Sequence, residues 1–369
     1  MTAAFTLILS FYLLLLLVFL IGWVRVRRQI MPVPSPSPPS VSIVVAVRNE
    51  LDNIKAVIGD LSGMAFPSER FEVIIVNDHS TDRTAEMARQ LIEGIPNSRL
   101  LELPIGREGK KAALQLGIEH ARFGIIATTD ADCALSKNWL RCVSSYFESY
   151  ETKMLVGAVK LVGDRTFFSR LQDVEFLSLV GSTASSVGLG HPIMCNGANL
   201  AFRKEVFTEV GGYYDNLVIA SGDDEFLMRK IFNRYPKGIR FLNYYEAVVS
   251  TQMQKTVHDF LHQRLRWAGK WKHNTDLVTQ FIAVFILIAQ LSFLALLFKN
   301  ILAPAATIGF VIAKVFMEGV FIFWIGRFLH RRFDVLAFVT LQLIYPIYVA
   351  GVGLFSIFSA YAWKSRNYK

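Results

Sequence analysis

Cysteine is scarce in this chain, and the three that are present are not arranged as pairs. Cys133, Cys142 and Cys195 stand among 369 residues, without disulfide-like spacing and without histidines at zinc-site intervals. A disulfide framework and a zinc site built on these thiols are therefore not expected. Free thiols are typical of a reducing compartment, so we expect the part of the chain outside lipid to face the cytosol.

The glycine-rich phosphate loops of common nucleotide-binding proteins are also missing. No G-x-G-x-x-G motif follows the first apolar run after residue 40, and residues 106–111 (GREGKK) lack the spacing of a Walker A loop. A dinucleotide site and a P-loop ATP site are disfavoured. Basic residues interleaved with aromatic ones occur only beside the long apolar runs, which argues against nucleic acid as a partner.

Apolar sequence and positive charge are present in excess. Hydrophobic residues make up 53% of the composition and the mean hydropathy is positive, which is too apolar for a purely soluble protein. Lysine and arginine number 39 against 30 aspartate and glutamate residues, a net charge of +9. We expect part of the chain to lie in lipid, and the basic excess suits anionic membrane lipids or a phosphate-bearing substrate.

The first apolar run predicts a membrane anchor over residues 1–28. Residues 5–24 carry no charge, and about 20 such residues cross a bilayer as a helix. Arg25, Arg27 and Arg28 follow directly, whereas a cleaved signal peptide would carry its positive charge before the apolar run. By the positive-inside rule these arginines lie in the cytoplasm.

A Pro/Ser-rich linker is expected over residues 29–40, and a second membrane region over residues 277–369. The apolar segments of that region are residues 277–298, 301–325 and 335–358. Lys314 and Glu318 lie one helical turn apart, and we expect them to pair for packing rather than for function. The basic tail conflicts with the positive-inside rule, so either Pro346 folds the last segment back as a hairpin or the tail is an exception.

Between the two membrane regions, short apolar runs alternate with helix-like stretches, which is typical of an α/β domain with a parallel sheet. This domain is assigned to residues 41–257. Strands are predicted at residues 41–47, 73–76, 99–103, 124–129, 155–161 and 239–242, and helices at residues 51–61, 84–92, 111–121 and 167–179. The last helix is expected to be core-packed rather than membrane- or acceptor-facing. Residues 258–276 predict an interfacial segment, with Trp267 and Trp271 at headgroup level.

Two predicted strands end in acidic residues. Asp130 and Asp132 follow one strand and Asp78 follows another, and open α/β sheets bind ligands at the carboxyl ends of their strands. Oxygen-only ligands suit Mg²⁺ or Mn²⁺, which would bridge a diphosphate while Asp78 contacts a base or ribose and Lys110 or Lys111 adds a cation. The alternative is that the aspartate pair turns the chain and caps a following helix.

A third acidic pair and an aromatic–basic motif follow later in the chain. Asp223 or Asp224, held near an acceptor hydroxyl, is suited to act as a general base, and helix capping is the alternative. Arg266 is suited to hold phosphate oxygens with two hydrogen bonds. Trp267 offers a flat surface for a sugar or for the membrane interface.

Together these residues resemble the GT-A glycosyltransferase family 2, and in particular its membrane-bound branch of cellulose, hyaluronan and chitin synthase-like and ceramide glucosyltransferase-like enzymes. The resemblance covers roughly residues 41–271. The motifs that carry it are Asp78, Asp130-Ala-Asp132, Gly222-Asp223-Asp224 and Gln263-x-x-Arg266-Trp267. It implies a Rossmann-like mixed sheet with flanking helices, joined to transmembrane helices, and a hexosyl- or N-acetylhexosaminyltransferase that inverts the anomeric centre in one in-line displacement.

The resemblance assigns roles on the donor side. Arg48 and Glu50 open the nucleotide-binding half, and Asp78 matches the acid that contacts uracil or ribose. Asp132 matches the metal ligand, and Asp130 supports it at the diphosphate of a nucleotide-sugar, expected to be UDP-linked.

The resemblance also assigns roles on the acceptor side. Asp224 matches the general base, with Asp223 in reserve. Gln263, Arg266 and Trp267 match the element that closes over the diphosphate and the acceptor end.

The expected function is transfer of a sugar to a lipid-linked or saccharide acceptor, at the cytoplasmic face of the cell (inner) membrane. Such transfer serves the synthesis of envelope polysaccharide or glycolipid. The number of apolar segments is smaller than polymer-extruding synthases generally have, yet a processive polysaccharide synthase remains an alternative. A non-catalytic nucleotide-sugar-binding membrane regulator and a nucleotidyltransferase are the alternatives of other classes.

Overall fold

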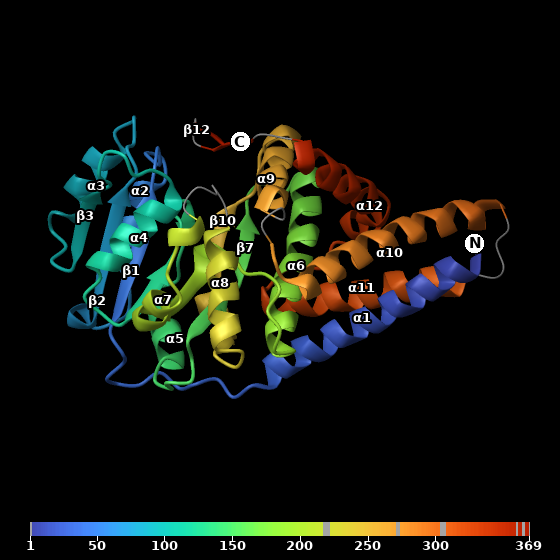
Figure 1. Ribbon diagram of the computed structural model, residues 1–369, viewed down its shortest axis with the longest axis horizontal. Coiled ribbons are helices and arrows are strands. Elements are labelled where there is room, and N and C mark those ends of the chain that lie inside the picture. The colour runs from blue at the N-terminus through green and yellow to red at the C-terminus, as the bar shows by residue number, and fades with distance from the viewer. Residues whose placement is uncertain are drawn as a thin grey trace.

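The protein is an α/β domain joined to a bundle of long apolar helices (Figure 1). The computed structural model describes residues 2–216, 222–270, 274–302, 308–358, 361–363 and 366–368. The expected fold class is confirmed: a mixed α/β sheet domain accompanies helices long and apolar enough to cross a membrane.

The main sheet has seven strands in the order β3-β2-β1-β4-β8-β6-β9. Strands β1 to β4 are parallel, whereas β8 runs antiparallel to both of its neighbours. The strands on the first side of the sheet are β1 (Val41–Val47), β2 (Phe71–Asn77), β3 (Ser98–Glu102) and β4 (Ile125–Thr128). The others are β6 (Met154–Gly157), β8 (Leu200–Arg203) and β9 (Ile239–Leu242). Apolar runs without alternation form β1, β2 and β4, because helices cover both faces of the sheet there.

The prediction of one strand over residues 155–161 is wrong. Strand β6 ends at Gly157, and β7 (Val159–Val162) joins β5 (Cys133–Ala134) and β10 (Val249–Gln252) in a separate small sheet. A side chain at Gly157 would overlap that of Asn199, whose amide donates to the Ala158 carbonyl at 2.8 Å. This close approach lets the chain pass from one sheet to the other.

Helices cover the sheet and close its edges. They are α2 (Ile54–Ser62), α3 (Thr84–Ile92), α4 (Lys110–His120), α5 (Trp139–Tyr146), α7 (Lys204–Glu209), α8 (Asp223–Arg234) and α9 (Val257–Gly269). Helix α4 packs on β1 and β2, and a side chain at Gly117 would overlap Val44 there. The predicted helices agree with α2, α3 and α4 to within three residues.

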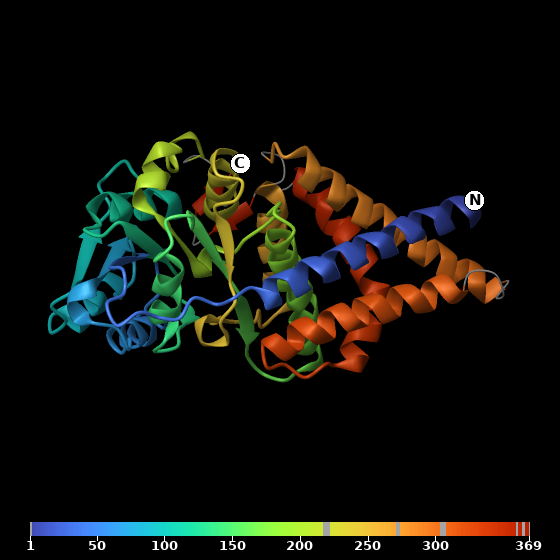
Figure 2. The ribbon, with the colours of Figure 1, turned by 90° about the horizontal axis from the view of Figure 1, so that it is seen from below.

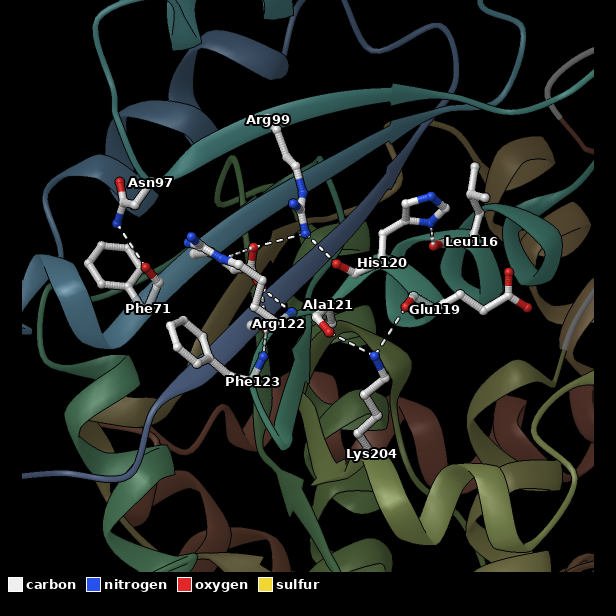
Figure 3. Close-up of polar contacts among 12 residues, drawn as sticks. Phe71, Asn97, Arg99, Leu116, Glu119, His120, Ala121, Arg122, Phe123 and Lys204 are labelled. Atoms are coloured by element: carbon white, nitrogen blue, oxygen red, sulfur yellow. Dashed lines mark hydrogen bonds and ion pairs between the residues drawn. The ribbon is translucent and has the colours of Figure 1, made fainter.

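A network of charged side chains lies at the end of the sheet opposite the acidic strand ends. The buried Glu72 carboxylate contacts Arg99 and Arg122 at 3.0 and 3.1 Å and accepts the Ser42 hydroxyl at 2.6 Å. Figure 3 shows Arg99 and Lys204 at the last carbonyls of α4, where Lys204 Nζ is 2.7 Å from the Ala121 oxygen. Cations at a helix C-terminus satisfy its unpaired carbonyls, so α4 is fixed at this end.

Four helices are long and apolar enough to cross a membrane. They are α1 (Thr2–Arg28), α10 (Leu277–Leu302), α11 (Ile308–Phe328) and α12 (Val335–Phe358), and Figure 2 shows α1 running beside α10 and α11 away from the sheet. Helix α12 continues through Pro346, so the segment does not fold back at this residue. Residues 361–363 and 366–368 pair as a short β-ribbon, β11 and β12, and the rest of the tail lies outside the described residues.

The predicted pair in the second apolar segment is present. Lys314 Nζ lies 3.0 Å from Glu318 and also donates to Gln342 at 2.6 Å. The Glu318 carboxylate accepts the Tyr12 hydroxyl at 2.5 Å and the Gln290 amide at 3.2 Å. The cluster joins α1, α10, α11 and α12, as expected of polar side chains that hold helices together in lipid.

Helix α6 (Phe167–Gly188) connects the two halves of the molecule. It is longer than the predicted helix, and it packs on α1, α11 and α12, as well as on β7 and β9. A side chain at Gly188 would overlap the Gly22 carbonyl oxygen, and one at Gly22 would overlap the Ser185 carbonyl. The backbones of α1 and α6 are therefore in direct contact. The many buried residues of α6 agree with a core-packed helix, although part of its surface packs on helices that are apolar enough to cross a membrane.

Candidate active site

A pocket of about 140 Å³ lies at the carboxyl end of β4. Its walls come from the loop after β4, the starts of α4 and α8, and the final turns of α9. The predicted site residues that line it are Asp130, Asp132, Lys110, Asp223, Asp224, Gln263, Arg266 and Trp267. Segments separated by more than 150 residues in the sequence thus contribute to one site.

Lys110 lies between two carboxylates of this pocket. Its ammonium is 2.7 Å from Asp130 and 3.4 Å from Asp223. Burial opposes the charge of Lys110, yet the two aspartates raise its pKa well above the ordinary value. Burial raises the pKa of Asp130, and Lys110 offsets part of that rise. For Asp223, burial works in the same direction, but Lys110 and Lys111 bring the pKa below its usual range.

Asp78 positions the start of α4 and does not line the pocket. Its buried carboxylate accepts the Gly109 amide at 3.0 Å, and Gly109 has a φ of 93°, which favours glycine. Lys110 follows directly as the first residue of α4. Asp78 therefore acts on the pocket indirectly: it fixes Gly109, and the next residue, Lys110, pairs with Asp130. Its contact with a base or ribose remains a prediction.

Arg48 and Glu50 hold loops together beside Asp78. Arg48 donates to the carbonyls of Asp78 and His79 at 2.7 and 2.8 Å. The Glu50 carboxylate accepts the Asn53 amide at 2.8 Å at the start of α2. Neither residue lines the pocket, and their role toward a nucleotide remains a prediction.

Lys111 is buried beside the pocket rather than in it. Its ammonium lies 5.0 Å from the centre of the Phe226 ring. Burial lowers the pKa of Lys111 to about 8, against the pull of Asp223 and Asp224. Of the two adjacent lysines, Lys110 is the one that faces the carboxylates.

The Asp132 carboxylate is exposed to the pocket. It contacts the Thr251 hydroxyl at 3.4 Å and the Cys133 thiol at 3.7 Å. The alternative that the aspartate pair caps the next helix is wrong, because α5 begins at Trp139 with Asn138 as its N-cap. Asp132 therefore offers oxygen ligands to the pocket without a competing lysine at ion-pair distance among the described residues.

Asp224 is held at the start of α8 by backbone amides. Gly222, with φ of 80°, precedes the helix. The Asp224 carboxylate accepts the Gly197 amide at 3.0 Å and the Glu225 amide at 2.8 Å. Asp224 thus accepts one amide at the start of α8, in partial agreement with the helix-capping alternative. The Asp223 carboxylate contacts Lys110 instead.

Helix α9 brings Gln263, Arg266 and Trp267 to the pocket. The Trp267 ring lies 4.4 Å from the Arg264 guanidinium and 6.5 Å from the centre of Phe176. Trp267 packs between α9 and α6 on the wall of the pocket, and its position at headgroup level remains a prediction. Trp271, predicted at the same level, lies outside the described residues.

Two buried ion pairs were missed by the sequence analysis. Arg264, inside the Gln-x-x-Arg-Trp motif, pairs with Glu175 of α6 at 3.0 Å. Lys270, three residues after Trp267, pairs with Glu225 at 2.7 Å, and Glu225 together with Asp224 raises the Lys270 pKa despite burial. The signal for the first pair was Glu175 itself, an acid directly before the apolar Phe176-Leu177 of α6.

Comparison with known proteins agrees with this geometry. Residues 42–211 match the model of the family described as "Glycosyl transferase family 2". Glycosyltransferase AglE of Haloferax volcanii is 29% identical over 198 residues, which are 50% of this chain and 59% of that protein. The beta-monoglucosyldiacylglycerol synthase of Synechocystis sp. is 26% identical over 232 residues, 62% of this chain and 47% of that one. The chain spans about half to three fifths of the length of these curated relatives.

The fold itself is shared with a solved enzyme. The mannosyltransferase PcManGT of Pyrobaculum calidifontis, in complex with GDP-Man and Mn²⁺, superposes with a TM-score of 0.62 at 20% identity. The superposition covers 96% of this chain and 99% of that one. The mixed sheet with its parallel core thus resembles the GT-A fold of this mannosyltransferase. The match to glycosyl transferase family 2 is thus a similarity of residues 42–211, somewhat under half of the chain.

Proposed function

We propose that the chain is a membrane-anchored inverting glycosyltransferase. It takes a hexosyl or N-acetylhexosaminyl group from a nucleotide-diphosphate sugar, UDP-linked by the resemblance, and gives it to a lipid-linked or saccharide acceptor. The observation that carries the proposal is the convergence of Asp132, Lys110, Asp224 and Arg266 on one pocket. Carboxylates, cations and a candidate base are the groups that sugar transfer from a diphosphate requires.

The residues present fit a divalent ion held mainly by its substrate. Among the described residues, no three acidic, histidine or cysteine side chains gather as a metal site. Mg²⁺ typically binds through one or two carboxylates plus substrate phosphates and water, and the exposed Asp132 beside Asp130 supplies that set. Asp132 would hold Mg²⁺ or Mn²⁺, with Asp130 in support. When bound, the ion neutralises the negative charge that develops on the departing diphosphate.

Side chains of the pocket would orient the donor and deprotonate the acceptor hydroxyl. Arg266 and Lys110 would hold the diphosphate oxygens, and Trp267 would provide the flat wall against which the sugar lies. Asp224 accepts the proton of the acceptor hydroxyl. The oxygen of that hydroxyl attacks the anomeric carbon on the face opposite the leaving group, and this attack inverts the configuration of the carbon. Asp223 is less suited to this role, because Lys110 stabilises its charged form.

The same geometry favours a cytoplasmic site at the cell (inner) membrane. Arg27, at the end of α1, donates to Asn243 of the α/β domain. The basic end of the first span therefore lies on the same side as the pocket, and the positive-inside rule places that side in the cytoplasm.

Nucleoside diphosphate release tests the proposal. The detergent-solubilised protein is incubated with a panel of nucleotide-sugars and Mn²⁺, in parallel with Asp224→Asn and Asp223→Asn. We expect one donor to release its nucleoside diphosphate, and Asp224→Asn to reduce transfer at least about 100-fold. Product length separates single transfer from processive synthesis. Pyrophosphate as the product, or unchanged turnover in both Asp132→Ala and Asp224→Ala, would overturn the proposal.

A further inference from the structure

A second cavity, of about 260 Å³, adjoins the catalytic pocket. The two share a common boundary formed by Phe176, Asn196, Asp224, Trp267 and Lys270. We call this second space the middle cavity. Its remaining walls come from α6, α9 and α12, from the start of α8, from the loop before β8, and from the strands β6, β7 and β9. The candidate base therefore lies between the donor pocket and a space bordered by α12, one of the helices apolar enough to cross a membrane.

A third cavity, of about 130 Å³, lies inside the helix bundle. It shares Glu175 and Tyr345 with the middle cavity. Its other walls come from α1, α6, α10, α11 and α12, and they include both apolar side chains and the Lys314–Glu318 pair. The three cavities are therefore neighbours, in the order from Asp132 past Asp224 to the interior of the bundle. A water-soluble acceptor needs no such extension, whereas an acceptor with an apolar part does.

The charges of the middle cavity are arranged in pairs. Among its described lining residues, the two cations are Arg264, which pairs with Glu175, and Lys270, which pairs with Glu225. Glu175 also accepts the Tyr348 hydroxyl at 3.0 Å. Asp224 is the third carboxylate, which leaves three negative charges against two positive ones. A phosphate head would meet net repulsion and no unneutralised cation here, while a neutral hydroxyl head would not.

The apolar lining of the middle cavity is correspondingly extensive. It includes Leu179 and Val180 of α6, Phe241 of β9 and Val349 of α12. Hydroxyl donors and acceptors of Tyr345 and Tyr348 line the side toward the bundle. Apolar walls with a few hydroxyl groups suit the glycerol-like head and first carbons of a lipid.

We propose that the middle cavity binds a neutral lipid alcohol as the sugar acceptor, with its hydroxyl at Asp224 and its apolar part directed toward the bundle cavity. This inference rests on the proposed function. The lipid oxygen forms the new bond to the anomeric carbon, and its proton passes to Asp224. The bond between that carbon and the diphosphate oxygen breaks, and its electron pair leaves with the nucleoside diphosphate.

Photo-crosslinking tests the site without requiring turnover. The full chain in phosphatidylcholine nanodiscs is irradiated with a diacylglycerol that carries a diazirine near its glycerol, and labelled peptides are identified by mass spectrometry. We expect labels on α6 and α12 around Val180 and Val349. Unlabelled diacylglycerol should reduce labelling at least fivefold, and polyprenyl phosphate should not. Labelling confined to the outer faces of the helices, or competition by the lipid phosphate alone, overturns the proposal.

A matched pair of variants on α12 links the site to transfer. Val349→Trp fills the middle cavity, and Val339→Trp places the same side chain on an exposed face of the same helix. We expect Val349→Trp to lose at least 90% of crosslinking and of diacylglycerol-stimulated nucleoside diphosphate release. Val339→Trp should retain both signals.

The outcomes separate this inference from the proposed function. Nucleoside diphosphate release that responds only to polyprenyl phosphate or to a soluble saccharide supports the transferase and overturns the neutral lipid. Crosslinking in the middle cavity without release from any donor supports the lipid site and overturns the transferase. Equal crosslinking in Val349→Trp and the parent chain overturns the site.

Discussion

The ammonium of Lys110 lies 2.7 Å from the carboxylate of Asp130. The same ammonium is 3.4 Å from the carboxylate of Asp223, which lies 93 residues after Asp130 in the sequence. One cation therefore holds together the donor-side and acceptor-side acids of the pocket. Its loss would leave carboxylates facing one another in a confined space.

Replacing Lys110 should shift the pH dependence of turnover. Lys110 favours the charged forms of Asp130 and Asp223, so Lys110→Met raises the pKa of both carboxyls. The ionised pocket then forms only at higher pH, and the acid limb of the kcat/KM profile moves upward, with about a 10- to 100-fold loss at neutral pH. Lys255→Met, at an exposed position, is the control. An unchanged acid limb would show that Lys110 does not hold these charges.

Replacing Asp132 should remove the dependence on a divalent ion. Asp132→Ala deletes the exposed carboxylate of the pocket, and we expect turnover to fall at least about 100-fold. The thermal midpoint of the purified protein should also stop rising on addition of Mn²⁺ with nucleoside diphosphate. Asp215→Ala removes a carboxylate that pairs with Lys230 at 2.9 Å on an exposed turn and should leave both signals intact. A Mn²⁺-dependent rise that persists in Asp132→Ala contradicts the assignment.

Replacing Glu72 should destabilise the α/β domain. The Glu72 side chain is 2% exposed, and Glu72→Ala leaves the Ser42 hydroxyl and the Arg122 amide without their acceptor. We expect a loss of about 2–4 kcal/mol in the free energy of unfolding. Thermal denaturation of the protein in detergent measures this loss. Glu151 pairs with Arg240 at 3.5 Å with its side chain 80% exposed, so Glu151→Ala should change stability by less than about 0.5 kcal/mol. Equal effects of the two substitutions would contradict a structural role of burial at Glu72.

The contact between α1 and α6 should not tolerate a methyl group. Gly188→Ala would bring its Cβ into the Gly22 carbonyl, so we expect a clear drop in the thermal midpoint and in the yield of folded protein. Gly59, within α2, has open space around its Cβ position. Gly59→Ala should therefore stabilise the protein by about 0.4–1 kcal/mol. A neutral Gly188→Ala would mean that the two helices can separate without cost.

Lys111 should make stability increase with pH. Burial lowers its pKa to about 8 from an ordinary value of 10.5, so the folded chain disfavours the charged lysine below pH 8. This cost disappears as pH rises from 8 to 10.5, where the unfolded chain also releases the proton. The midpoint advantage of Lys111→Met over the parent should therefore shrink between pH 7 and pH 10. A difference that is constant with pH would contradict a buried charge at this position.

Several features of the fold follow directly from sequence pattern. The apolar runs of β1 and β4 predict strands covered on both faces. The acids that follow β2 and β4 mark the carboxyl ends of the strands, where such sheets bind ligands. Hydropathy alone predicts α1, α10 and α12, since lipid requires long uncharged helices. Gly157 is a different case, because a short, mostly apolar segment with one glycine does not show that one strand ends there and that the next belongs to another sheet.

The site is predictable to the extent that its residues lie at strand ends or in motifs. Asp130, Asp132 and Asp224 meet in the pocket as their positions suggest. Asp78 does not, because whether its side chain points into the pocket or back to Gly109 depends on one backbone amide in a distant loop. Partners such as Glu175 for Arg264 depend on how α6 packs on α9, and tertiary packing of this kind leaves no periodic pattern in the sequence.

The glycine contact between α1 and α6 has a consequence for the choice of acceptor. The touching backbones fix α1 and α6 relative to one another, and α6 contributes Phe176 to the wall of the pocket. We therefore expect the height of the pocket above the bilayer to be nearly constant. At a fixed height, a lipid hydroxyl that protrudes from the membrane too far, or not far enough, would not reach the base. Selection among lipids would then depend on headgroup length as much as on headgroup chemistry.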